Sequence, residues 1–185
     1  MTDRESLRLL LLERSVERGE FVLASGRRSS IYVDCRRTTM SAQGMALIGR
    51  MGWTALQRLG WLPASVGGLT MGADPVACAI AAASFGSDHP VNAFSVRKQL
   101  KEHGTGRLIE GNFQPGDAVV VVEDVITSGD SAGRALSAVE QAGGRVLGVL
   151  AVVDREDEGR RSLEAQGYAV VALITLSELG LRDTT

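Results

Sequence analysis

Short apolar runs of strand length alternate with helical stripes along most of this chain. A continuous apolar run indicates a strand buried on both faces, whereas apolar residues spaced three and four apart indicate an amphipathic helix. The predicted strands are Val66–Leu69, Val91–Val96, Val119–Val122, Val146–Val153 and Tyr168–Ile174. The predicted helices between them are Asp74–Ala83, Ser131–Ala142 and Arg160–Gln166. This alternation is typical of an α/β fold with a mostly parallel central sheet and helices on both faces.

The first forty residues show a different pattern. The elements expected here are a helix over Leu7–Val16, short strands over Glu20–Leu23 and Ile31–Val33, and a helix capped by Ser41 that continues to Leu59. We interpret residues 1–40 as a small N-terminal hood whose packing the sequence does not determine. Because the chain contains no linker, repeat or low-complexity segment, we expect residues 1–185 to form one domain.

The composition narrows the class of protein. A hydrophobic content of 44% and a net charge of −2 fit a globular protein and argue against partners such as nucleic acid or an anionic membrane. No apolar run approaches the roughly 20 residues of a membrane span. Cys35 and Cys78 form no CxxC motif, and with only His89 and His103 as histidines a Cys/His metal cage is not expected. We therefore expect a cytoplasmic protein.

The strongest candidate site follows the four valines of residues 119–122. Two adjacent carboxylates, Glu123 and Asp124, stand where this strand ends, and a turn of small residues leads into the next helix. A buried strand followed by a turn with capping residues is the simpler interpretation, but it leaves the paired acids unexplained, because a buried unpaired charge is costly. A glycine-containing turn at a helix N-terminus suits a phosphate, and the acids suit sugar hydroxyls or a cation. The pattern indicates a ribose 5-phosphate; the GxxxxGK[ST] and GxGxxG motifs are absent.

This strand, acid pair, loop and helix closely resemble the motif with which type I phosphoribosyltransferases bind 5-phosphoribosyl 1-diphosphate (PRPP). The resemblance implies that Glu123 and Asp124 hold the 2- and 3-hydroxyls of the ribose and that the following loop cradles the 5-phosphate. The PRPP-binding residues implied after the acid pair are Val125, Ile126, Thr127, Ser128, Gly129, Asp130 and Ser131. It also implies the fold of that family, a mostly parallel central sheet flanked by helices with a small N-terminal hood.

A second segment, residues 97–111, shows neither the helical nor the strand pattern of apolar residues. It carries several cations, one histidine and three glycines. A solvated surface loop is the usual explanation of such a charge run. We favour a mobile lid, because the run follows a strand end and its glycines provide hinges. Cations that arrive only on closure would stabilise the charge developing on a departing diphosphate more than they stabilise the ground state.

The spacing of Arg97, Lys98, Lys101 and His103 resembles the catalytic loop of one branch of the family, the orotate phosphoribosyltransferases. By this resemblance all four residues contact PRPP, with Arg97 and Lys98 gripping its diphosphate. Lys101 and His103, together with Asp124, are then the residues of the catalytic step. In that branch the loop reaches into the active site of a neighbouring subunit, which implies a homodimer.

Three further segments resemble the same branch, at residues 21–34, 67–75 and 153–156. The last implies that Arg155 binds the orotate carboxylate, since an arginine fork matches a carboxylate; a surface salt bridge with a neighbouring acid is the alternative. Thr127 would donate to the pyrimidine ring, and stacking on orotate would fall to Tyr32 and Val33.

The chain also departs from the pattern of this branch. Ala24 stands where many members carry a lysine, and Thr70 and Met71 stand where a Tyr-Lys pair is common. Two polar or cationic contacts to ligand are therefore missing, which bears on affinity more than on the reaction.

The resemblance implies transfer of ribose 5-phosphate from PRPP to orotate, giving orotidine 5-monophosphate and diphosphate in UMP biosynthesis. It also implies Mg²⁺ carried by PRPP, with no direct protein ligand, which suits an ion that keeps much of its water shell. Two alternatives stay open: a purine-type phosphoribosyltransferase, and a regulator that keeps the fold to sense nucleotides. Arg155 argues against the first, and Lys101 with His103 against the second.

Overall fold

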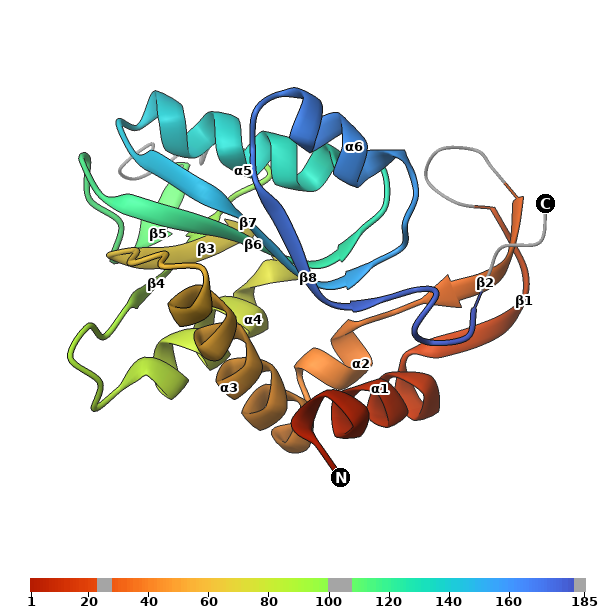
Figure 1. Cartoon of the computed structure of the whole chain (residues 1–185). Helices are drawn as coiled ribbons and strands as arrows, with labels where there is room; N and C mark the ends of the chain where they lie inside the picture. Colours follow the sequence, from red (N-terminus) through yellow and green to blue (C-terminus); the bar gives the residue numbers. More distant parts are fainter. Residues whose placement is uncertain (23–27, 100–107, 182–185) are drawn as a thin grey trace.

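The computed structural model describes residues 1–22, 28–99 and 108–181, and its elements follow the predicted alternation (Figure 1). The helices are α1 (Asp3–Arg14), α2 (Arg36–Thr39), α3 (Ala42–Arg58), α4 (Ala73–Ser84), α5 (Asp130–Gln141) and α6 (Glu158–Ala165). The strands are β1 (Val16–Val22), β2 (Arg28–Val33), β3 (Ser65–Leu69), β4 (Asn92–Val96), β5 (Ile109–Gly111), β6 (Ala118–Ile126), β7 (Arg145–Asp154) and β8 (Val170–Thr175). No helix in these described ranges is both long and apolar enough to cross a bilayer.

The central sheet has the strand order β5-β4-β3-β6-β7-β8. Every neighbouring pair is parallel except β4 and β5, which are antiparallel. The chain passes from β3 outward to β4 and then returns to place β6 on the other side of β3. In an open parallel sheet such a reversal leaves a crevice beyond the carboxyl ends of the two strands, where ligands bind. The loops after β3 and β6 therefore flank the expected binding crevice.

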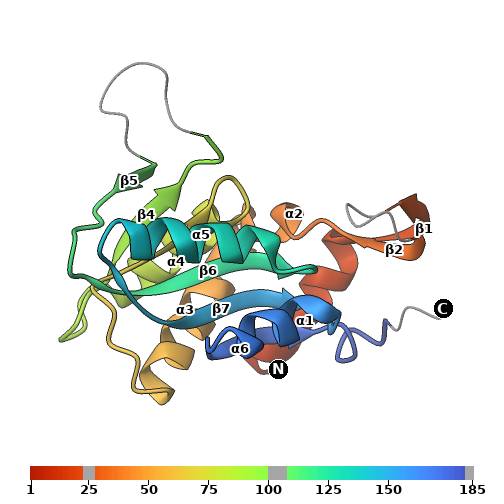
Figure 2. The same cartoon turned by 90° about the horizontal axis from the view of Figure 1, so that it is seen from above.

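Helices cover both faces of the sheet, as predicted. Figures 1 and 2 place α5 and α6 on one face and α3 and α4 on the other. The valines of β6 alternate between the two resulting cores: Val120 and Val122 face α3 and α4, whereas Val119 and Val121 face α5. All four are fully buried, which explains why this strand has no polar position before its acid pair.

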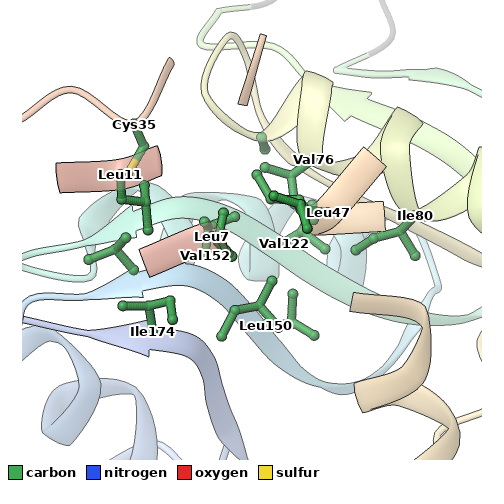
Figure 3. Packing of buried hydrophobic residues seen from close by; sticks show 14 of the residues in the cluster. Leu7, Leu11, Cys35, Leu47, Val76, Ile80, Val122, Leu150, Val152 and Ile174 are labelled. Carbon is green, nitrogen blue, oxygen red and sulfur yellow. The ribbon is translucent and has the colours of Figure 1, made fainter. Parts of the chain in front are cut away.

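The hood packs through its first helix. Leu7 and Leu11 of α1 join the larger core together with Leu47 of α3 and Ile174 of β8 (Figure 3). Helix α1 begins at a Thr2 cap, whose hydroxyl accepts a hydrogen bond from the Glu5 N–H. It ends at Arg14, so the predicted continuation to Val16 is wrong. The antiparallel β1–β2 hairpin lies beyond the carboxyl ends of β6 and β7, on the same side as α2 (Figures 1 and 2).

Two further predictions need correction. Residues 109–111 of the predicted lid form β5, which pairs with residues 94–96 of β4. Strand β6 continues to Ile126, so Glu123 and Asp124 lie inside the strand rather than after it. Both differences arise because a neighbouring strand supplies hydrogen-bond partners: β4 orders residues 109–111, and β7 pairs with β6 as far as Ile126.

Candidate active site

The acid pair is the most unusual electrostatic feature of the described chain. Glu123 is only 5% exposed. Its burial, and then the negative charge of Asp124, raises the pKa of Glu123 well above its usual range. Its Oε2 atom is buried and has no hydrogen-bond partner among the described residues. A buried acceptor without a donor is costly, so this atom is suited to accept a hydrogen bond from a ligand hydroxyl.

Asp124 points toward the loop that follows β3. A Cβ atom placed on Gly72 would lie 2.6 Å from Asp124 Oδ1, so the carboxylate rests against the Gly72 backbone. Burial raises the pKa of Asp124, while hydrogen bonds from the Glu123 carboxyl and the Val125 N–H act in the opposite direction. Asp124 Oδ1 accepts the latter bond at 2.9 Å. The buried Glu123 and the half-buried Asp124 thus lie together at the β3–β6 crevice.

The loop after β6 forms a small pocket at the N-terminus of α5. The pocket is lined by Glu123 and residues 125–132. Gly129, the N-cap of α5, adopts the left-handed conformation with φ of 84°, and no side chain caps the helix. The Asp130 N–H donates to the Ser128 hydroxyl oxygen at 3.4 Å, and the positive end of the α5 dipole at this turn suits a phosphate.

The N-terminus of α6 supports this loop from outside. The Gly159 N–H donates to the Thr127 carbonyl oxygen at 3.0 Å. A Cβ atom on Gly159 would lie 2.3 Å from that oxygen and 2.6 Å from the Gly129 nitrogen. Gly159 was not predicted as a site residue, since an isolated glycine near a helix start gives no signal of what it touches.

Arg155 follows β7 at the same edge of the sheet. Its N–H donates to the Ile126 carbonyl oxygen at 3.2 Å, and its Nε lies 3.3 Å from Asp157 Oδ2. The salt bridge with a neighbouring acid, the alternative interpretation of Arg155, is therefore present, but it is buried rather than on the surface, because Arg155 is only 3% exposed. An arginine fork matches a carboxylate, and the role of Arg155 toward orotate stays a prediction.

Comparison with known proteins supports this arrangement over the whole chain. No family model matches the sequence. The orotate phosphoribosyltransferase of Aquifex aeolicus is 43% identical over 182 residues, covering 97% of this chain and 98% of the relative. That of Mycobacterium avium is 46% identical over 179 residues, covering 96% of each. This chain belongs to the orotate phosphoribosyltransferase family.

Solved structures agree with this assignment. The Mycobacterium tuberculosis orotate phosphoribosyltransferase in complex with PRPP matches with a TM-score of 0.81 and 42% identity, covering 97% of this chain and all of the other. The adenine phosphoribosyltransferase of Saccharomyces cerevisiae, at 20% identity and a TM-score of 0.67, shares the fold. The predicted type I phosphoribosyltransferase fold is confirmed.

The two hood residues predicted to stack on orotate lie on opposite faces of β2. Tyr32 is 38% exposed on β2, and its ring lies 5.4 Å from that of Phe21. Val33 points the other way and is buried in the core, so the predicted stacking role of Val33 is wrong. Ala24 lies outside the described residues. The stacking role of Tyr32 stays a prediction.

The stems of the predicted lid are described, but its centre is not. Arg97 Nε pairs with Glu110 Oε1 at 2.9 Å, and the Arg97 N–H donates to Leu108. The carbonyl oxygen of Lys98, whose side chain is exposed, accepts a bond from Arg134 of α5 at 2.7 Å. Lys101 and His103 lie outside the described residues, so their predicted roles stay predictions.

Arg36 is a cation near the acid pair that sequence reasoning missed. Its guanidinium forms an ion pair with Asp34 at 2.7 Å, and its charge acts to lower the pKa of Asp124. No spacing along the chain links α2 to β6. Within the described ranges, no three histidine, cysteine or acidic side chains gather as a metal site.

Proposed function

We propose that this chain transfers ribose 5-phosphate from PRPP to orotate, giving orotidine 5-monophosphate and diphosphate in pyrimidine biosynthesis. In this reaction N1 of orotate loses its proton and bonds to C1 of the ribose, while the C1–O bond breaks and its electron pair leaves with diphosphate, which can take up the proton. The observation that carries the proposal is the pair of buried Glu123 and half-buried Asp124 beside the N-terminus of α5.

The acid pair would hold the ribose. A hydroxyl of the sugar can donate to the otherwise unpartnered Glu123 Oε2, which offsets the cost of burying that atom. The Asp124 carboxylate would fix the neighbouring hydroxyl and lies near the reacting carbon in this placement. Because positive charge develops on the sugar as diphosphate departs, a carboxylate held there favours the transition state.

The phosphate loop would anchor the other end of the ribose. Backbone N–H groups of residues 127–131 and the α5 dipole provide the donors for the 5-phosphate. Arg155 would receive the orotate carboxylate, with Asp157 holding the guanidinium in place. Together these contacts place N1 of orotate against C1 of the ribose, and such positioning supplies much of the rate enhancement.

Mg²⁺ is proposed to accompany PRPP. Mg²⁺ keeps much of its water shell and commonly binds through substrate phosphates, so PRPP and water would supply its ligands. When bound it would neutralise charge on the diphosphate. Glu123 and Asp124 would hold it indirectly, through the ribose hydroxyls.

The remaining proposals concern the predicted lid, the oligomeric state and the cellular location. Lys101 and His103 would stabilise the departing diphosphate, with Arg97 released from Glu110 to bind it. We propose a homodimer in which these residues serve the neighbouring site. We also propose a cytoplasmic location.

A spectrophotometric assay tests the reaction. The purified protein with PRPP, Mg²⁺ and orotate should cause the loss of orotate absorbance, whereas adenine, guanine or hypoxanthine in place of orotate should not be consumed. Arg155→Ala should raise the KM for orotate about 100-fold, since a charged pair contributes roughly 3 kcal/mol. Arg161→Ala, on the exposed side of α6, is the matched control and should retain wild-type kinetics. A folded protein that consumes a purine instead, or leaves orotate unchanged, would refute the proposal.

A further inference from the structure

We propose that Asp74 is a positioning residue for the diphosphate end of the PRPP site. It would hold the loop at residues 70–72 in the conformation that receives the diphosphate. This inference rests on the proposed function and concerns a residue outside the acid pair, the phosphate loop and the lid.

Asp74 joins two strands through hydroxyl groups. The Thr70 hydroxyl donates to Asp74 Oδ2 at 2.7 Å, and the Ser95 hydroxyl donates to Asp74 Oδ1 at 2.7 Å. Thr70 follows β3 and Ser95 lies on β4, so the carboxylate links the exits of both strands. We refer to Thr70, Asp74 and Ser95 as the Asp74 bridge. Hydrogen bonds to a charged acceptor are stronger than those between neutral groups.

The backbone reinforces the same connection. The Thr70 N–H donates to the Val96 carbonyl oxygen at 2.8 Å. Asp74 lies in the first turn of α4, yet no side chain caps that helix at Gly72. The carboxylate of Asp74 is therefore used to fix the loop and leaves the first N–H groups of α4 without a side-chain acceptor.

The loop lies across the crevice from the phosphate loop. Gly72 rests against the Asp124 carboxylate, whose partner Glu123 lines the phosphate pocket. If the acid pair holds the ribose and residues 127–131 hold the 5-phosphate, the 1-diphosphate must extend toward the remaining wall of the crevice. Residues 70–72 lie on that side, because Gly72 rests against the Asp124 carboxylate.

The side chains of Thr70 and Met71 provide neither a positive charge nor a free hydrogen-bond donor for the diphosphate. The Thr70 hydroxyl is donated to Asp74, and Met71, which is 54% exposed, carries no charge. The remaining donors are backbone N–H groups at the start of α4, whose direction depends on the loop conformation. A rigid loop holds these donors in place before the substrate binds, which lowers the entropic cost of binding. The Asp74 bridge provides this rigidity.

Four single variants and one double variant test the role by steady-state kinetics and by calorimetric titration with PRPP and with diphosphate, both with Mg²⁺. Asp74→Ala should raise the KM for PRPP and weaken diphosphate binding about tenfold, with kcat and the KM for orotate changed less than about twofold. Thr70→Val and Ser95→Ala should each produce a smaller rise. Combining Thr70→Val with Asp74→Ala should add little, because both remove the same connection. Asp74→Asn should restore most of the affinity, since its amide can accept from one hydroxyl and donate to the other.

Asp117→Ala is the control for a purely structural role. Asp117 also fixes a turn, accepting from the Gln114 N–H at 2.9 Å, but at the opposite end of the sheet. Asp117→Ala should lower the melting temperature without a selective change in the KM for PRPP.

If Asp74→Ala does not fold, Thr70→Val carries the test. An unchanged KM for PRPP in both Thr70→Val and Ser95→Ala, or an equal loss of orotate and PRPP binding, overturns the inference. Wild-type protein that fails to consume orotate would instead refute the proposed function.

Discussion

Two loops leave the carboxyl ends of adjacent parallel strands and enter helices, yet they are held by different means. The loop after β6 is fixed by its backbone. Gly129 adopts the left-handed backbone conformation, and Gly159 packs directly on the loop. The loop after β3 is fixed by side chains, through the hydrogen bonds of Thr70 and Ser95 to Asp74. Both loops lead into a helix whose N-cap residue is a glycine without a side-chain cap, and the acid pair lies between them.

The comparison shows that a loop at a helix N-terminus can be held in place either by its backbone or by its side chains. A backbone-built loop needs glycines and close contacts, so even one added methyl group should displace it. A loop held by side chains should tolerate single losses better, since its backbone bond to Val96 remains. The following predictions test this contrast, from the largest expected effect to the smallest.

The acid pair between the loops should carry the largest effect. Asp124→Ala should lower kcat/KM about 1,000-fold, because it removes the carboxylate that would accept a hydrogen bond from a hydroxyl of the bound ribose. Steady-state assays with both substrates varied would measure this. A loss below tenfold would show that the ribose is held elsewhere.

Gly159→Ala should damage the loop after β6. The added Cβ would lie 2.3 Å from the Thr127 carbonyl oxygen, so the loop must shift. The KM for PRPP should rise about 10- to 100-fold, the range expected for overpacking at a rigid site. Gly133→Ala in α5 is the matched control, since a Cβ there meets nothing within 4 Å. It should keep wild-type kinetics and gain up to about 1 kcal/mol of stability from helix propensity.

Gly72→Ala should disturb the other loop through Asp124. Its backbone conformation, with φ of −64°, accepts alanine, so any effect comes from the contact 2.6 Å away with the carboxylate. We expect kcat/KM to fall about tenfold, because an exposed loop can yield more than the packed one. A larger loss than that of Gly159→Ala would reverse the contrast between the loops.

Protonation of Glu123 should give the smallest effect. Burial raises its pKa, so above the ordinary glutamate value of 4.5 the folded protein keeps a proton that the unfolded chain has released. The free energy of unfolding should therefore fall as pH rises from 4.5 toward the raised pKa. Glu123→Gln should flatten this decline by on the order of 1 kcal/mol, measured by urea unfolding at several pH values. An identical slope in the variant would contradict the raised pKa.

The sequence predicted most of the fold because its signals are local. The valines of β6, the Ser41 cap and the helical stripes each act within a few residues, and the structure places the corresponding elements close to their predicted bounds. Strand β5 and helix α2 were missed. A strand of three residues carries little periodicity and exists here through pairing with β4.

The sequence alone determined the acid pair, the glycine-containing loop and the order of elements that carry them, since all of these lie within one continuous segment. Only the tertiary structure decided which distant residues support that segment. Gly159 against Thr127, Gly72 against Asp124, and Asp74 with Ser95 join positions that are 20 or more residues apart, and Arg155 is buried by the way its neighbours pack. Such contacts depend on how the strands and helices are arranged in space, which no local pattern specifies.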